Sequence, residues 1–226
     1  MKRVIVAIDG PAGAGKSSVA KAVAEKLGLA LVDTGAIYRC VALAAQRAEI
    51  DWSDDEALAR LLPWLDIAFK IEGGVNRVSM RGEDVTEAIR TPEISKGASA
   101  VSARPVVRAG LLDLQRKLAR GAQSGAVLEG RDIGTVVFPE ATVKLFVTAS
   151  DEVRAERRHQ ELKAKGMEVP LEQVLADQRQ RDKDDSTRDV APLKPAYDAK
   201  LLDTSTLPLD QVIDQVVSQV ERAMGR

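Results

Sequence analysis

Residues 10–17 read Gly-Pro-Ala-Gly-Ala-Gly-Lys-Ser, which matches the phosphate-binding pattern G-x-x-x-x-G-K-[ST] in full. An apolar run at 4–8 precedes it and an amphipathic helical pattern follows, which is the strand–loop–helix context that the motif requires. Glycines let the backbone curl its N–H groups toward one point, where the helix N-terminus adds positive charge. Lys16 can then bridge the terminal phosphates, and the Ser17 hydroxyl can ligate Mg²⁺. The sequence therefore predicts a nucleoside triphosphate site.

Arginines supply the next candidate chemistry, because 20 of the 33 basic residues are arginines. Phosphoryl transfer depends on positioning and on positive charge around the transferred group, which makes clustered arginines candidate phosphate ligands. Arg154, Arg157 and Arg158 fall at i, i+3 and i+4 and so share one predicted helix face. Two interpretations remain open: a mobile arm that closes on the triphosphate, or a solvated face that pairs with acidic neighbours.

A second charged set lies further along the chain. Arg181, Asp185 and Arg188 fall at i, i+4 and i+7, which makes one stripe if the predicted helix continues that far. The run at 181–185 is also dense enough in charge to be a solvated surface. Both interpretations stay open for this set.

Polar residues also follow two predicted core strands directly. Arg131 and Asp132 come after the strand at 126–129, and Asp33 and Thr34 end the strand that begins at residue 29. Ligands of open α/β sheets lie outside the carboxyl ends of the strands. We therefore expect these residues to lie beside the phosphate loop.

The elements that must position these residues alternate between strand and helix. Apolar runs predict core strands at 4–8, 29–32, 126–129, 143–149 and Lys200–Asp203. Helical patterns follow at Lys16–Leu27, 36–48, from Pro105 to about Arg120, after Ser150, at about 171–185 and from near Pro208. This alternation predicts an α/β fold, a P-loop doubly wound five-stranded parallel sheet with right-handed crossovers.

The middle of the chain has a different periodicity. Ile67, Phe69 and Ile71 alternate with other residues, and glycines at 73–74 offer a turn. Such alternation is typical of a half-exposed antiparallel ribbon rather than of a strand buried on both faces. We predict a small antiparallel β insert at 62–103 within one domain that spans 1–226.

Composition limits the function classes. The 226 residues are 45% apolar and 30% charged with a net charge of −1, which argues against broad binding to nucleic acid or membrane. Cys40 is the only cysteine and is expected to be a buried small hydrophobe, whereas His159 is expected to be exposed on its helix. With no signal-like or membrane-spanning stretch, we expect a cytoplasmic enzyme and a monomer.

Several segments together resemble the bacterial cytidylate kinases, a family of nucleoside monophosphate kinases. They are the segments at 8–18, 33–39, 82–86 with 89–90, 130–139 and 190–193. The resemblance runs along essentially the whole chain and implies ATP-dependent, Mg²⁺-dependent phosphorylation of CMP and dCMP. It matches the insert to the monophosphate-binding region of the family and residues 150–170 to its short helical lid.

The resemblance also implies site residues. ATP binding is implied for Gly10, Pro11, Ala12, Gly13, Ala14, Gly15, Lys16, Ser17, Ser18, Arg154, Arg157 and Arg158, with Ser17 as the metal ligand. CMP binding is implied for Ser99, Arg108 and Asp132 at the cytosine, Arg181 and Asp185 at the ribose, and Thr34, Arg39, Arg131 and Arg188 at the acceptor phosphate. Catalytic roles are implied for Lys16, Arg131, Arg158 and Arg188. Thr34 stands where the family often has Ser, and Glu129 stands where Asp is common.

The chemistry of cytosine agrees with these roles. Its exocyclic amine is a donor that Asp132 can accept, and its acceptors suit Arg108 and Ser99. Uracil would place a carbonyl against the carboxylate, so such a site penalises it. The acceptor phosphate is its own nucleophile and needs no general base.

Two other functions stay open on the residues alone. A kinase for a hydroxyl acceptor would need a base, for which Asp33 is available, although the many acceptor-side arginines favour a phosphorylated acceptor. A GTPase-like switch would need Asn-Lys-x-Asp after a core strand, and Asn76 is the only asparagine in the chain.

Overall fold

A computed structural model describes residues 3–225 of the chain. Its core is a five-stranded parallel sheet in the order β2-β6-β1-β7-β8, which confirms the predicted fold class. The strands are β1 (Val4–Asp9), β2 (Ala30–Asp33), β6 (Gly125–Gly130), β7 (Val143–Thr148) and β8 (Lys200–Asp203). Asp9 pairs in register with Gly130 and Asp33 with Glu129, so three neighbouring strands end at one edge of the sheet.

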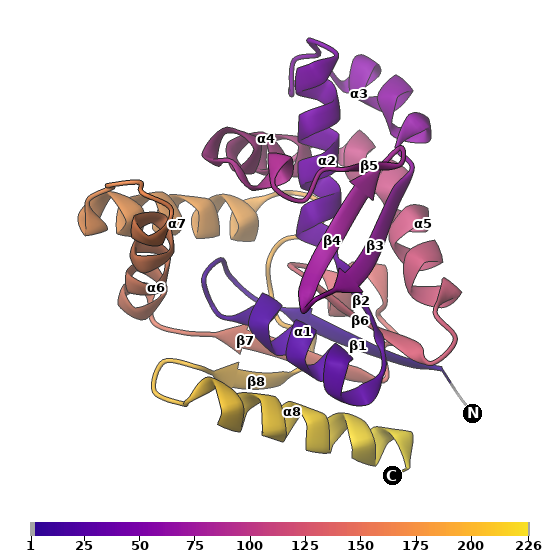
Figure 1. Cartoon of the computed structure of the whole chain (residues 1–226), viewed down its shortest axis with the longest axis vertical. Coiled ribbons are helices and arrows are strands. Elements are labelled where there is room, and N and C mark those ends of the chain that lie inside the picture. Colours follow the sequence, from indigo (N-terminus) through magenta and orange to yellow (C-terminus); the bar gives the residue numbers. More distant parts are fainter. Residues whose placement is uncertain (1–2, 226) are drawn as a thin grey trace.

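Helices cover both faces of this sheet, as Figure 1 shows. One face carries α1 (Lys16–Leu27) and α8 (Leu209–Met224), and the other carries α2 (Thr34–Arg47) and α5 (Pro105–Gly121), with α4 (Pro92–Ser102) packed against α2. Helix α8 buries a stripe of valines at positions 212, 216 and 220. Each fully buried valine stabilises the fold by about 1.5–3 kcal/mol. Within residues 3–225, no helix has both the length and the apolar character that a membrane span needs.

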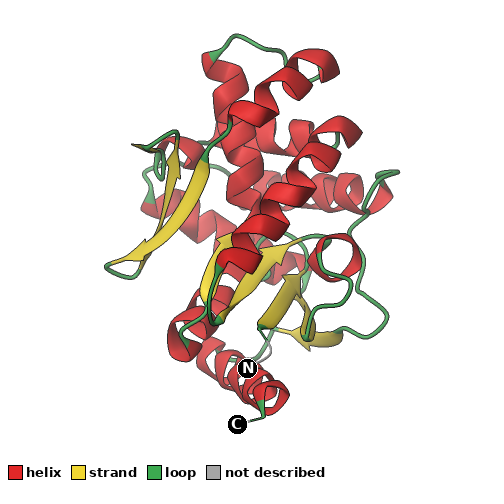
Figure 2. Ribbon diagram, turned by 90° about the vertical axis from the view of Figure 1, so that its right-hand side faces the viewer, coloured by secondary structure: helices red, strands yellow, loops and turns green. Residues whose placement is uncertain are grey.

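The insert contains the predicted antiparallel ribbon, which stands apart from the core sheet in Figure 2. It is formed by β3 (Ile67–Glu72), β4 (Val75–Met80) and β5 (Glu83–Asp84). The β3–β4 turn uses two glycines with positive φ of 55° and 71°, a conformation that other residues rarely adopt.

Helices and turns surround this ribbon where the sequence analysis expected none. They are α3 (Asp55–Leu61), the 3₁₀ turns η1 (Leu62–Trp64) and η2 (Ala88–Arg90), and α4. The start of α4 has a local signal, because the Thr91 hydroxyl accepts a hydrogen bond from the Ile94 amide. The bounds 62–103 remain a prediction.

An arm of two packed helices projects beside the phosphate loop (Figure 1). It consists of α6 (Asp151–Ala164) and α7 (Leu171–Thr187), which bury Ala155, Leu162 and Val174 between them. Helix α7 ends one residue before Arg188, whose backbone is extended, so the helical stripe expected from the spacing does not form. The chain turns back there, and the Leu193 amide donates to the Asp185 carbonyl at 2.8 Å.

Candidate active site

The phosphate loop joins β1 to α1 in a conformation that only glycine permits at its start. Gly10 has φ of 147°, and a Cβ there would lie 1.9 Å from the Val147 carbonyl oxygen. Gly13 and Gly15 also have positive φ, of 74° and 87°. The buried Lys16 ammonium donates to the Pro11 carbonyl at 2.6 Å. The loop therefore curls around its own lysine, as a phosphate-binding loop requires.

The oxygen atoms beside this loop fit a magnesium ion. The Ser17 hydroxyl, in the first turn of α1 beside the exposed Ser18, donates to the Glu129 carboxylate at 2.7 Å. Hydroxyl and carboxylate oxygens are the ligands that Mg²⁺ prefers, with phosphates and water completing its shell. Among residues 3–225 no group of three His, Cys, Asp or Glu side chains is arranged to hold a metal ion.

Burial perturbs the two ionisable groups at the end of the loop. Burial raises the pKa of Glu129 to about 7, with the Asp33 carboxylate adding to the shift and Lys16 opposing it. Burial and the positive charge of Arg131 lower the pKa of Lys16 to about 7, which Glu129 opposes. An incoming phosphate would favour the charged form of Lys16.

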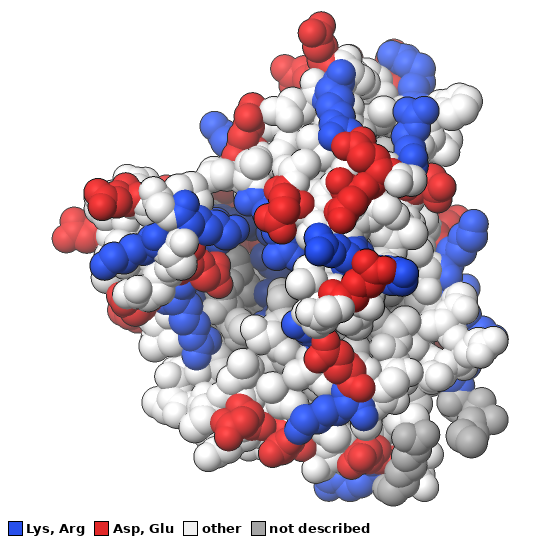
Figure 3. All heavy atoms as spheres, in the orientation of Figure 1, with Lys and Arg blue, Asp and Glu red and all other residues white. Residues whose placement is uncertain are grey.

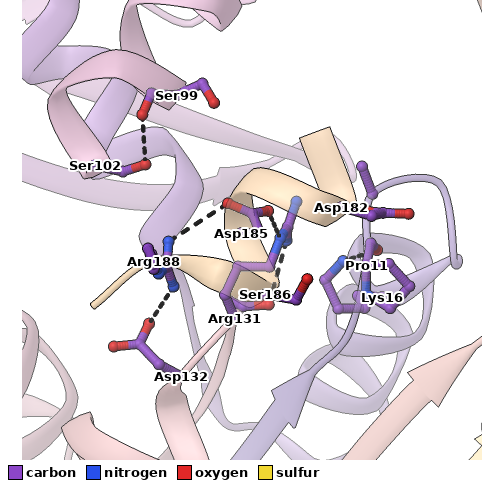
Figure 4. A network of polar contacts seen from close by, with 12 residues as sticks. Pro11, Lys16, Ser99, Ser102, Arg131, Asp132, Asp182, Asp185, Ser186 and Arg188 are labelled. Carbon is purple, nitrogen blue, oxygen red and sulfur yellow. Dashed lines mark hydrogen bonds and ion pairs between the residues drawn. The ribbon is translucent and has the colours of Figure 1, made fainter. Parts of the chain in front are cut away.

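Guanidinium groups gather around one carboxylate across from the loop, as Figure 4 shows. The buried Asp185 accepts from Arg131 Nε at 2.9 Å, and Arg188 Nη1 lies 3.4 Å from it. Burial would raise the pKa of Asp185, but Arg131, Arg181 and Arg188 lower it overall. Burial and the charge of Arg131 lower the pKa of Arg181 to about 10. Asp132 also lies 4.0 Å from Arg188, but it is shared with Arg108, so four guanidinium groups meet two carboxylates and the cluster has a surplus of positive charge.

Two of these guanidinium groups have nitrogens left for a ligand. Arg181 Nε and Arg188 Nη2 are buried and make no hydrogen bond to residues 3–225. Arg39, half-buried on α2, lies close enough for its charge to lower the pKa of Arg181. Figure 3 shows Lys and Arg side chains in the recess between the α6–α7 arm and the body of the molecule. Unpaired buried donors of this kind are suited to phosphate oxygens.

A separate ion pair lies next to this cluster. Arg108 and Asp132 are both buried and contact each other at 2.5 Å, and Arg108 also donates to the Ser102 carbonyl at 3.1 Å. The second Asp132 oxygen lies 4.0 Å from Arg188 Nη2. Asp132 therefore keeps an oxygen that is open to a donor such as an amine.

The remaining acceptor-side residues border the same space. The Thr34 hydroxyl donates to the Glu129 carbonyl at 2.7 Å, between the ends of β2 and β6. Ser99 is half-buried on α4, and its carbonyl accepts from the Ser102 hydroxyl at 2.9 Å (Figure 4). Contacts thus join Arg108, Arg131, Asp132, Asp185 and Arg188, and Thr34 lies at the neighbouring strand ends, whereas the contact of Ser99 is a local one within α4.

The three arginines of α6 do not form a cluster of this kind, because each contacts a different set of protein groups. Arg154 is buried and contacts the Ala149 and Ala12 carbonyls and the carboxylates of Asp151 and Asp182. Arg157 donates to the hydroxyl and the carbonyl of Thr204 at 3.0 and 2.7 Å. Arg158 is 35% exposed and pairs with Glu161 at 3.0 Å. Their predicted contacts with ATP remain predictions.

Several residues that contact the site have no role predicted from the sequence. Tyr38 places its ring 5.5 Å from the Arg108 guanidinium, and Asp182 pairs with Arg154. Asp9 lies within the segment 8–18 and received no role of its own, although its position at the end of β1, next to Gly10, is a signal. Thr204 holds the arm and the loop together, since its hydroxyl also donates to the Ala14 carbonyl at 3.1 Å.

A glycine-rich phosphate loop that faces a buried arginine cluster across the ends of parallel strands defines a kinase of the P-loop class. The family model described as "Cytidylate kinase" matches residues 6–222. The chain therefore belongs to the cytidylate kinase family. This membership confirms the predicted ATP-dependent kinase of the cytidylate class and does not favour a kinase for another small acceptor.

Individual relatives agree with this assignment. A protein named cytidylate kinase from Geobacter sulfurreducens is 53% identical over 223 residues, which cover 97% of this chain and 95% of the relative. Cytidylate kinase 1 of Haemophilus influenzae is 48% identical over 219 residues, covering 97% and 94%. A solved structure of an uncharacterized protein from Eubacterium ventriosum covers 97% of this chain and 99% of its own, at a TM-score of 0.53 and 13% identity. That likeness shows the fold alone.

Proposed function

We propose that the phosphate loop binds ATP and that the arginine cluster binds CMP or dCMP, so that the two nucleotides meet end to end. The observation that carries this proposal is the surplus of buried positive charge around Asp185, beside Lys16. Uncompensated buried charge is costly, and an acceptor phosphate would neutralise it. Arg131 and Arg188 would hold the acceptor phosphate, together with Thr34 and Arg39.

Base selection would rest on the Arg108–Asp132 pair. The free oxygen of Asp132 can accept from the exocyclic amine of cytosine, while Arg108 and Ser99 satisfy the cytosine acceptors. Uracil would bring a carbonyl to the carboxylate, which leaves two acceptors facing each other. Asp185 and Arg181 would contact the ribose.

The transfer itself needs little covalent work from the protein. An oxygen of the acceptor phosphate bonds to the γ-phosphorus, the bond to the β–γ bridging oxygen breaks, and ADP leaves. Lys16, Arg131 and Arg188 would stabilise the charge on the transferred group, and Arg158 would add to it when the arm closes. Mg²⁺, held by Ser17 with Glu129 on its water shell, would neutralise charge on the ATP phosphates when bound.

In this proposal two regions of the chain move when the substrates bind. Residues 62–103 would close over the monophosphate and residues 150–170 would act as the lid over ATP. We also expect a monomer and a cytoplasmic location, and the single Cys40 supports the latter.

One assay tests the base assignment. Rates with CMP, dCMP, UMP and AMP are measured by the release of ADP from ATP in the presence of Mg²⁺. We expect kcat/KM for CMP to exceed that for UMP and AMP by at least about 100-fold, because a buried polar site left unpaired discriminates strongly. A faster reaction with UMP or AMP would contradict the base assignment while leaving the kinase class intact.

A variant of Asp132 tests whether this residue distinguishes cytosine from uracil. Asp132→Asn removes the carboxylate and supplies an amide that can donate to the carbonyl of uracil. We expect the ratio of kcat/KM for CMP to that for UMP to fall by more than about tenfold. An unchanged ratio would show that Asp132 does not read the base.

A further inference from the structure

Asp9 is a buried carboxylate that the proposed chemistry does not use. It ends β1 next to Gly10 and is 3% exposed. Its two oxygens accept hydrogen bonds from the backbone amides of Ile133 and Gly134, both at 2.7 Å. Both partners lie in the loop that follows β6, where Arg131 and Asp132 also lie. Asp9 thus joins the phosphate loop to the acceptor loop.

The two amides open a π-helical turn, η3 (Ile133–Val137), and the first amides of a helix have no partner within it. The residue at the N-cap is Asp132, a residue type that usually accepts from these amides itself. Here the Asp132 side chain makes no capping bond. Asp9 supplies the cap from the neighbouring strand, because the register places it opposite Gly130.

Because Asp9 accepts from the two amides, the Asp132 carboxylate remains available for other contacts. One oxygen pairs with Arg108 at 2.5 Å and the other faces Arg188 at 4.0 Å. If Asp9 did not accept from the two amides, the nearest acceptor of the usual kind would be Asp132 itself. Asp132 would then turn away from Arg108 and from the base.

The turn is also held from its other side. A Cβ on Gly134 would lie 3.3 Å from Asp9 Oδ2 and 3.3 Å from Lys144 Cδ. The Lys144 side chain is buried and donates to Asp198 at 2.9 Å, which fixes it in place. The turn therefore fits between two fixed side chains and has little room to shift.

We propose that Asp9 is a positioning residue for base selection: by capping η3 in place of Asp132, it directs the Asp132 carboxylate toward the acceptor base. This inference rests on the proposed function, in which Asp132 reads cytosine. Both oxygens of Asp9 are occupied by amides of the acceptor loop, so its removal should alter acceptor recognition more than ATP binding.

The test compares Asp9→Asn with the wild-type chain. Asparagine keeps the shape but can accept from only one of the two amides, because its NH₂ group faces the other. We expect KM for CMP to rise about tenfold and the CMP-to-UMP ratio of kcat/KM to fall about tenfold, with KM for ATP within about twofold of wild type. Asp54→Ala is the matched control, since Asp54 caps α3 by accepting from the Ala57 amide at 2.9 Å. The control should leave both CMP values unchanged.

A second readout does not depend on catalysis. Hydrogen exchange of the Ile133 and Gly134 amides should accelerate by about tenfold in Asp9→Asn and remain unchanged in Asp54→Ala. If Asp9→Asn fails to fold, Gly134→Ala tests the same contact from its other side and should shift the same CMP values. A wild-type chain that does not phosphorylate CMP would contradict the proposed function, and the exchange rates would still decide whether Asp9 is the cap. Unchanged exchange, an unchanged base ratio in an active enzyme, or equal rises in both KM values would overturn the role of Asp9.

Discussion

The arginines around Asp185 and the arginines of α6 are both clustered, but their surroundings differ. Around Asp185, three guanidinium groups face one buried carboxylate and leave nitrogens unpaired. In α6, by contrast, the single residue Arg154 contacts two carboxylates and two carbonyls. The number of arginines is thus a poor guide to a phosphate site. A surplus of buried positive charge is the better one, because it requires an anion from outside the chain.

The largest expected effect comes from removing a positive charge from the arginine cluster around Asp185. Arg131→Ala should lower kcat/KM for CMP by about 1,000-fold or more, since it removes a guanidinium that would contact the transferred group. The matched control is Arg179→Ala, an exposed α7 arginine that pairs with Asp151 and Glu152. It should change kcat/KM by less than about twofold. Steady-state kinetics of both variants, with circular dichroism to confirm folding, measure the difference, and a near-normal Arg131→Ala enzyme would contradict the proposed geometry.

Removing the charge of Arg154, which neighbouring carboxylates already balance, should act mainly on the stability of the fold. Arg154→Met leaves Asp182 partly buried without its partner, and breaking a buried pair costs about 3–5 kcal/mol. Because Arg154 also donates to the Ala12 carbonyl, the phosphate loop should loosen and KM for ATP should rise by about tenfold. Chemical denaturation and ATP titration measure the two effects. Normal stability combined with a large loss of kcat would instead make Arg154 a ligand of the triphosphate.

The comparison also shows which parts of the site the sequence could reveal. The phosphate loop and α1 were predictable because their signals are local: glycines at fixed spacing, then an apolar helical pattern. The stripe of Arg181, Asp185 and Arg188 was predicted less well, because α7 ends at Thr187 and a turn of the chain, rather than helical spacing, brings Arg188 to Asp185.

Contacts between distant segments left no local signal. Asp9 and the Gly134 amide are 125 residues apart in sequence, and Arg154 and the Ala12 carbonyl are 142 apart. Nothing in the spacing of either residue indicates its partner, since the sheet order β6-β1-β7 brings them together. The helices around the ribbon were missed although Asp54 and Thr91 were available as N-caps, because the period-two pattern of the strands dominated the interpretation of that segment.

A pH profile separates the ATP side of the site from the acceptor side. Burial raises the pKa of Glu129 to about 7, so the carboxylate beside Ser17 is lost as pH falls through that value. We expect kcat/KM for ATP to fall by about tenfold per pH unit below 7, with kcat at saturating ATP and Mg²⁺ less affected, because bound metal favours the ionised form. Glu129→Gln should abolish this limb. On the alkaline side, the charge of Lys16 is lost as pH rises through its lowered pKa of about 7. Because Glu129→Gln removes a negative neighbour that raises this pKa, the alkaline limb should move to lower pH. If the acid limb of the wild-type profile persists unchanged in Glu129→Gln, it belongs to the titration of another group.

The smallest expected effect tests the two interpretations of the α6 face. Arg158 is half-buried, and its only polar contact within residues 3–225 is the pair with Glu161, itself 61% exposed. Such a pair contributes only about 0–1 kcal/mol, so Arg158→Ala should leave the unfolding midpoint unchanged. If the arm closes over the triphosphate, kcat should still fall by about fivefold, which corresponds to one charge contact made only in the closed state. Glu161→Ala, which frees the same guanidinium, is the control and should not lower kcat. An Arg158→Ala enzyme with wild-type kcat would make this face a solvated surface, and the surplus of charge around Asp185 would then supply the catalytic arginines by itself.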